Sequence, residues 1–222
     1  MFVGHTAVAM AAKSRARGVS LGYFMIAAFA LDLLWPLFLL AGVEEVRIVP
    51  HATAFNGLEF VSYPWSHSLV MAILWGLCAF AVTRWRRGPA SLGWLLAGVV
   101  VSHWVLDFVT HVQDLPLWPG PSPRLGLRLW DSIPGTLLVE GALFAMGVTL
   151  YLHGTRSRDW VGHAGLWGFV LTSTAMWAAG PWSALPPSPR ALAFFSLGVW
   201  ALVAWAWWAD AHRVESSGGR TR

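Results

Sequence analysis

The chain has 222 residues, of which 56% are hydrophobic and only 12% are charged. A soluble domain carries about 25% charged residues, so this composition excludes an ordinary soluble domain and favours a membrane protein. The single cysteine, Cys78, excludes a disulfide framework or a thiolate metal cluster within one chain. The net charge of +4 does not indicate nucleic-acid binding, because most positive charges fall in short loops between apolar segments. We therefore expect a membrane as the partner and no nucleic acid.

Apolar segments of helical length follow one another along the chain. Residues 1–12 are too short to cross a bilayer, and the segments that follow cover residues 18–42, 64–83, 90–110, 133–152, 160–180 and 190–209. They predict an all-α, polytopic integral membrane bundle of about six transmembrane helices. We expect one domain over residues 1–209, with the site in residues 1–145 and two packing helices in residues 160–209. The polar tail, residues 210–222, is expected to be disordered.

Basic residues predict the orientation of this bundle. With the N-terminus inside, eleven basic residues fall on the cytoplasmic side and four on the outer side. The inner set is Lys13, Arg15, Arg17, Arg84, Arg86, Arg87, Arg156, Arg158, Arg213, Arg220 and Arg222, and the outer set is Arg47, Arg124, Arg128 and Arg190. The positive-inside rule then places both termini in the cytoplasm.

The third apolar segment carries the most informative pattern. His103, Asp107 and His111 are spaced four residues apart, so on a helix they share one face. Two imidazoles and a carboxylate on one face suit a transition metal. Ionisable groups inside a membrane segment indicate function by default, although such groups can also serve as polar contacts between helices.

Depth brings further ionisable groups to the same level. At about 1.5 Å per residue, Asp32 and His103 lie roughly 20 Å above the inner ends of their segments. His67 opens the descending second segment, and Glu140 lies about 10 Å below the outer end of the fourth. These residues, with Asp107, should meet in the outer half of the bilayer. His5 lies too near the inner side to join them unless residues 1–12 fold back into the bundle.

The same residues resemble a known family. Gly4-His5, Asp32, Ser66-His67-Ser68 and Ser102-His103-x-x-x-Asp107 resemble motifs of the bacterial membrane-bound metal-dependent hydrolases, over roughly residues 1–145. That family is distantly similar to zinc-dependent phospholipase C and the single-strand nucleases. The resemblance implies a bacterial inner-membrane protein in which His5, Asp32, His67, His103 and Asp107 are metal ligands. Two positions depart from the family pattern, Leu34 in place of a second aspartate and Ser62 in place of a second histidine.

These patterns lead to one preferred function and two alternatives. We expect a zinc-dependent hydrolase of a phosphoester or phosphodiester in a lipid or lipid-linked substrate, with one to three ions. Asp32, Asp107 and Glu140 are the candidate catalytic carboxylates, and His111, Asp114 and Glu140 could supply a second ion. Asp131 is a further candidate, or else a residue of the N-cap region of the fourth helix. The alternatives are a metal-binding transporter, for which we see no internal repeat, and a non-catalytic membrane protein.

Overall fold

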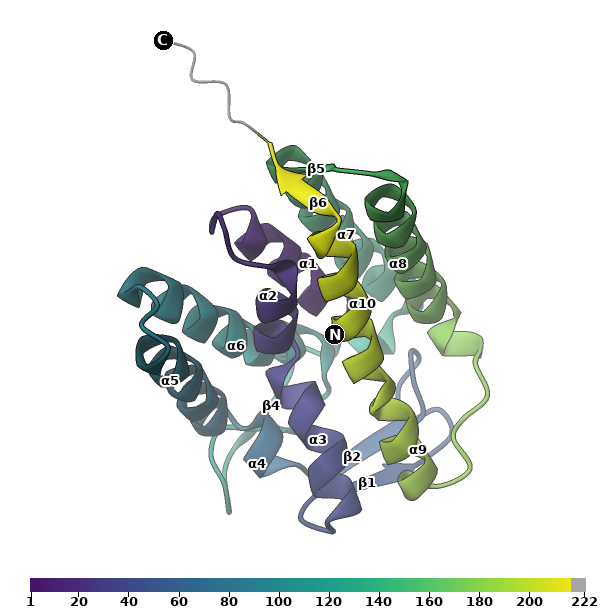
Figure 1. Ribbon diagram of the computed structural model, residues 1–222. Helices are drawn as coiled ribbons and strands as arrows, with labels where there is room; N and C mark the ends of the chain where they lie inside the picture. The colour runs from purple at the N-terminus through teal and green to yellow at the C-terminus, as the bar shows by residue number, and fades with distance from the viewer. Residues whose placement is uncertain (217–222) are drawn as a thin grey trace.

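The computed structural model describes residues 1–216, and this part of the chain is mostly helical (Figure 1). The helices are α1 (Phe2–Lys13), α2 (Leu21–Ala28), α3 (Ala30–Leu40), α4 (Pro64–His67), α5 (Leu69–Trp85), α6 (Ala90–Thr110), α7 (Ile133–Gly154), α8 (Trp160–Ala179), α9 (Pro189–Ser196) and α10 (Gly198–Ala211). The expected helical bundle is therefore confirmed at the level of secondary structure.

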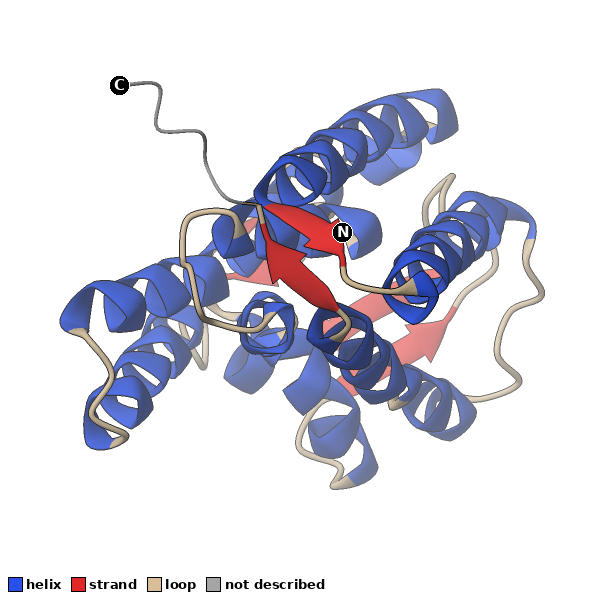
Figure 2. Cartoon of the chain, turned by 45° about the horizontal axis from the view of Figure 1, so that its top comes forward, coloured by secondary structure: helices blue, strands red, loops and turns tan. Residues whose placement is uncertain are grey.

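Short antiparallel strand pairs form in three connecting regions that were expected to be loops or tail (Figure 2). The pairs are β1 (Glu45–Ile48) with β2 (Leu58–Ser62), β3 (Leu115–Pro116) with β4 (Arg124–Leu125), and β5 (Thr155–Ser157) with β6 (Arg213–Glu215). Two 3-10 turns, Leu129–Asp131 and Gly180–Trp182, complete the described elements. Pairing satisfies the backbone groups of these connections where they lie against the bundle.

Several helices are long and apolar enough to cross a membrane. They are α6, α7 and the segment Pro189–Ala211 formed by α9 and α10, and the bent pair α2–α3 makes a fourth if it is one span. The helix α5 is apolar but has only 17 residues, because the predicted second segment breaks at Ser68. The fifth predicted segment forms α8 but is not among the candidate spans. The structure thus supports three to four spans, and a total of six remains a prediction.

The helices α2 and α3 meet at Phe29 with a bend of 52°. Phe29 has φ −101° and ψ 11°, outside the helical range, so the hydrogen-bond ladder is interrupted there. The bend leaves the carbonyl oxygen of Ala28 free to accept a hydrogen bond from His103 on α6. A local irregularity of the backbone thereby becomes part of the site.

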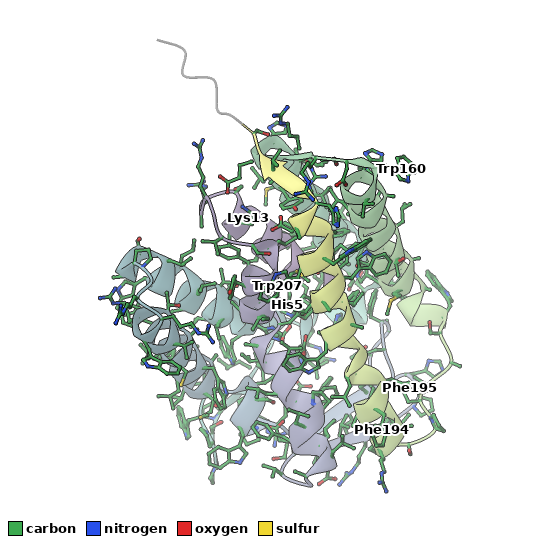
Figure 3. All side chains as sticks on the ribbon, in the orientation of Figure 1. His5, Lys13, Trp160, Phe194, Phe195 and Trp207 are labelled. Atoms are coloured by element: carbon green, nitrogen blue, oxygen red, sulfur yellow. The ribbon has the colours of Figure 1, made fainter. Side chains whose placement is uncertain are left out.

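The first helix lies inside the bundle and packs against α7, α2 and α6. Gly147 of α7 permits this approach, since a Cβ atom there would lie 2.5 Å from the Cα atom of Ala7. His5 consequently lies near the middle of the molecule (Figure 3) and is almost fully buried. The fold thus brings residues 1–12 into the bundle, which was the condition for His5 to join the other candidates.

The beginning of the C-terminal tail is ordered, contrary to the expectation from composition. Asp210 and Ala211 belong to α10, and β6 pairs with β5. Glu215 of β6 forms an ion pair with Lys13 at 2.9 Å, and Asp210 accepts a hydrogen bond from the backbone of Leu21. These contacts hold the tail against the ends of α1 and α2. Residues 217–222 lie outside the described part of the chain.

Candidate metal centre

Asp107 is the residue on which the other candidate ligands converge. Its Oδ1 atom lies 3.1 Å from Nε2 of His5 and 2.6 Å from the amino nitrogen of Met1. Its Oδ2 atom lies 3.1 Å from Nε2 of His103 and 3.8 Å from Nε2 of His67. The carboxylate is 2% exposed, so it is paired almost entirely within the protein.

The hydrogen bond of His103 determines which of its ring nitrogens is free. Nδ1 of His103 lies 2.7 Å from the carbonyl oxygen of Ala28, which can only accept, so Nδ1 carries the proton. In the neutral ring Nε2 is then an unprotonated acceptor, and it is buried with no hydrogen-bond partner in the described chain. In the neutral ring a lone pair therefore points at the carboxylate oxygens, and either a metal ion between these atoms or a proton on Nε2 would satisfy the arrangement.

A second orienting chain holds His67. The Ser66 hydroxyl donates to Oε2 of Glu44 at 2.7 Å, and Oγ of Ser66 lies 2.7 Å from Nδ1 of His67. Because the only hydroxyl proton goes to Glu44, we assign the proton between Ser66 and His67 to Nδ1. Nε2 of His67 is then the free nitrogen, and it faces Oδ1 of Asp32 at 3.5 Å.

Glu44 also accepts hydrogen bonds from the backbone amides of Trp65 and Ser66, at 2.9 and 2.8 Å. Burial raises the pKa of the Glu44 carboxyl, while the hydrogen bonds from Ser66 act in the opposite direction. Glu44 thus fixes both the short helix α4 and the tautomer of His67. Sequence reasoning missed this residue because it belongs to a polar loop far from the Ser-His motif in the chain.

The free nitrogens and the carboxylate oxygens have the spacing of a tetrahedral site. Zinc–ligand bonds of 2.0–2.1 Å imply about 3.3 Å between neighbouring ligand atoms. Nε2 of His103 lies 3.1 Å from Asp107 and 3.8 Å from Asp32, and Nε2 of His67 lies 3.5 Å from Asp32. Asp32, His67 and His103 form one group of atoms within 4.8 Å of one another. These residues fit a zinc-like ion without rearrangement of the backbone.

A second group of the same kind consists of His5, His103 and Asp107. The rings of His5 and His103 are stacked, with centroids 3.6 Å apart and planes 6° from parallel. Both groups use the same free nitrogen of His103, and an imidazole nitrogen has one lone pair for one metal. The two groups therefore share His103 and offer room for one ion there, with His5 and Asp107 on one side of that position and His67 and Asp32 on the other.

His111 departs from the predicted helical face. The helix α6 ends at Thr110, and His111 is its C-cap in an extended conformation. Its Nδ1 atom lies 3.0 Å from Oδ1 of Asp114, while its Nε2 atom lies 4.0 Å from Oδ2 of Asp107. The Tyr63 hydroxyl donates to Asp114 at 2.9 Å. His111 thus borders the site but belongs to neither group of candidate ligands.

Glu140 and Asp131 also lie outside the two groups. Glu140 is completely buried, and neither of its oxygens has a hydrogen-bond partner within residues 1–216. It faces the backbone amides of Phe2 and Gly4 at the start of α1, where the helix dipole favours negative charge. Asp131 is exposed and forms an ion pair with Arg128 at 2.7 Å, next to the N-cap Ser132 of α7.

Among the residues Asp32, His67, His103 and Asp107, solvent reaches only Asp32 to a substantial extent. The side chain of Asp32 is 29% exposed, whereas those of His67, His103 and Asp107 are at most 6% exposed. A substrate or a bound water can therefore reach the centre from the side of Asp32. Closed surroundings with one open direction are typical of a catalytic rather than a purely structural metal site.

Comparison with protein-family models finds no match, and no curated protein or solved structure matches the chain.

Replacing Glu44 tests the orienting chain. Glu44→Ala removes the acceptor for three donors, the backbone amides of Trp65 and Ser66 and the Ser66 hydroxyl. Buried donors without partners cost about 1–3 kcal/mol, so the free energy of unfolding in detergent should fall by about that amount. The matched control is Glu45→Ala, since Glu45 is 54% exposed and pairs only with Arg47; its effect should stay within about 0.5 kcal/mol. Equal effects of both substitutions would contradict the assigned role.

Proposed function

We propose that the chain is a membrane-embedded, zinc-dependent hydrolase of a phosphoester or phosphodiester in a lipid or lipid-linked substrate. The observation that carries the proposal is the pair of fixed imidazoles. In the neutral rings Nε2 of His67 and Nε2 of His103 are the free acceptors, because their Nδ1 atoms are occupied, and both face carboxylates at 3.1–3.8 Å. A divalent cation is the group that satisfies all of these atoms together.

A bound zinc ion polarises a phosphoryl oxygen and lowers the pKa of a bound water. The residues of this chain would then divide the work. His67 and His103 hold the ion in one orientation through Glu44–Ser66 and the Ala28 carbonyl. Asp107 balances charge from the buried side, and Asp32, at the accessible side, is placed to orient the attacking water. Glu140 lies at the start of α1, so we assign it to positioning that helix rather than to chemistry.

The surroundings of the centre support a lipid substrate. The centre lies between α6 and the bent pair α2–α3, both of which are apolar enough to cross a membrane. On the helices that carry Asp32 and His67, the large apolar side chains of Leu37 and Trp65 are 44% and 46% exposed. Exposed apolar surface beside a polar centre suits a ligand with both an apolar and a phosphate-containing part. We place the protein in the bacterial cytoplasmic membrane, by the resemblance to the membrane-bound metal-dependent hydrolases.

The transporter alternative is less well supported. Transit through a membrane protein needs polar groups continuing from one side to the other. On α6 the residues one, two and three turns below His103 are Val100, Leu96 and Leu92. They give an ion at His103 no partner on its inner side.

Metal content is the first expected outcome. The double substitution His67→Ala/His103→Ala should remove zinc from the purified protein, measured by elemental analysis, because it deletes both fixed nitrogens. His153→Ala/His163→Ala is the matched control, since both histidines are exposed. Ser66→Ala should weaken zinc binding by about 10–100-fold, the usual effect of losing an outer hydrogen bond. Full retention of zinc in the first double variant would overturn the proposed centre.

Hydrolysis is the second expected outcome. Asp32→Ala and Asp107→Asn should each lower the turnover of a phosphodiester lipid by about a hundredfold or more, since ligand losses exceed those of outer-shell partners. The assay is a panel of phospholipids and lipid pyrophosphates, and size-exclusion chromatography checks folding. Asp131→Asn is the control, because Asp131 pairs only with Arg128 at the surface. If the wild type moves zinc into vesicles and hydrolyses nothing, the transporter function replaces this one.

Topology is the third expected outcome. We propose six crossings with the C-terminus and the end of α1 at Lys13 on the cytoplasmic side, on the charge distribution of the loops. The expected cytoplasmic N-terminus is corrected, because the Met1 amino group is buried beside Asp107. Reporter fusions after Arg87 and Arg158 should report the cytoplasm, and a fusion after Arg124 should report the outside. A cytoplasmic fusion at Arg124 would place the centre on the other face of the membrane.

A further inference from the structure

A large apolar cleft lies between α2–α3 on one side and α5–α6 on the other, with α10 contributing Trp200 and Trp207. Figure 1 shows α5 standing away from α2, while α6 passes behind α2 into the bundle. Figure 3 shows Trp207 beside α2. The cleft has a volume of about 940 Å³, near the upper end of the range for ligand sites. It exists because α5 packs mainly against α6 and α4 and leaves its side toward α2 uncovered.

The cleft is apolar along its length. Its walls carry side chains such as Ile26, Trp75 and Leu92, and within the described chain Arg86 is the only charged residue that lines it. Arg86 lies at the inner end, beside Thr83 and Gly88. From Arg86 to Trp75 the cleft follows eleven residues of α5, which is roughly 16 Å.

The upper end of the cleft stops about one helical turn short of the candidate metal centre, whose ligands do not line it. On α6 the lining residues Leu92, Leu96 and Val100 are spaced four apart, and His103 follows Val100 within one turn on the same face. On the opposite wall, Ala27 precedes the residue whose carbonyl holds His103, and Leu33 follows Asp32. Cleft and centre are thus consecutive stretches of the same helices.

A hydrocarbon chain is the occupant that suits this space. Apolar cavities exclude water. The helices that form the walls include candidate membrane spans, so the molecules around the cleft would be lipid chains. Leaving the bilayer for the cleft brings no hydrophobic gain, because lipid tails are as apolar as leucine. Close packing along about 16 Å can nevertheless set the position of a chain.

We propose that the cleft binds one hydrocarbon chain of a lipid whose phosphate-containing head group lies at the His67–His103 centre. The proposal rests on the proposed function and specifies its substrate as a lipid with a long chain that points toward the inner side. The polar end meets His67, His103 and Asp32, and the chain passes Val100 and Leu96 toward Val82. The cleft then selects substrates by chain length and aligns the phosphate with the centre.

Photo-crosslinking in vesicles tests the orientation directly. The probes are two forms of one phospholipid, with a diazirine either near the head group or near the end of a 16-carbon acyl chain. Peptide mapping should place the first label near residues 30–34, 75 and 100, and the second near residues 82–92. The reverse order would mean that the head group lies at Arg86, and labelling without order would mean that the cleft meets only bulk lipid. Either result overturns the proposal.

Filling the cleft provides the matched comparison. Ala79→Trp fills its middle and Val82→Trp its exposed inner end, whereas Leu77→Trp places the same bulk on the same helix outside the cleft. Ordered labelling means that the head-group probe marks the upper end of the cleft and the chain-end probe the lower end. Ala79→Trp and Val82→Trp should reduce this ordered labelling by about tenfold, and Leu77→Trp should not. Zinc content should be unchanged in all three. Unaltered labelling in Ala79→Trp and Val82→Trp would contradict the proposal, even if one variant folds poorly.

Crosslinking also separates this proposal from the proposed function. The double variant His67→Ala/His103→Ala should keep ordered labelling of the chain, because the walls do not include these residues. Ordered labelling without hydrolysis in the wild type would refute only the enzymatic function. Hydrolysis without ordered labelling, with equal turnover of long-chain and six-carbon-chain lipids, would refute only the lipid-chain site.

Discussion

The structure depends on compensating the carboxylates of Asp107, which is 2% exposed, and Asp32, which is 29% exposed, inside an apolar bundle. Besides the amino group of Met1, they face the Nε2 atoms of His67 and His103, which are acceptors in the neutral rings because Nδ1 carries the proton. Burying a carboxylate without compensation costs several kcal/mol. The two carboxylates carry a charge of about −2, and the buried amino group of Met1, 2.6 Å from Asp107, supplies +1 of the balance when protonated; a bound cation or a protonated imidazole would supply the remainder. The fixed hydrogen bonds, rather than the mere proximity of His and Asp, are what make these groups candidate metal ligands.

Each imidazole owes its orientation to an irregular piece of backbone. The bend at Phe29 frees the Ala28 carbonyl for His103, and the break at Ser68 forms the short helix α4, which places Ser66 between Glu44 and His67. In unbroken helices the Ala28 carbonyl would bond within its own helix, and Ser66 would not lie between Glu44 and His67. Broken helices at membrane depth are tolerated where the freed groups find partners in the protein. The centre and the breaks in α2–α3 and α4–α5 therefore stabilise one another.

Local spacing predicted the part of the site that lies on one helix. His103 and Asp107 are four residues apart, and α6 continues through both, so they share a face as expected. The spacing rule does not apply to His111, because α6 ends at Thr110. The extended C-cap brings its Nδ1 to Asp114, while its Nε2 stays 4.0 Å from Asp107. Depth along the spans correctly brought Asp32 and His67 to His103. Neither rule could place Glu44 or α1, because their positions depend on tertiary packing, such as the contact of Ala7 with Gly147.

The distribution of polarity around His103 argues for chemistry rather than passage. Polar groups surround the imidazole on the side of Asp32, His67 and Asp107, while Val100 and the apolar cleft follow on the inner side. An ion that entered from the side of Asp32 would meet no further ligand along α6, and moving it inward would cost the full desolvation of a divalent charge. A lipid matches this change from polar to apolar surroundings, since its phosphate would lie at the polar ligands and its chain would pack against the apolar cleft. Under the proposed function, the same arrangement of side chains would hold a cation and admit an amphipathic molecule, the combination that hydrolysis of a membrane lipid requires.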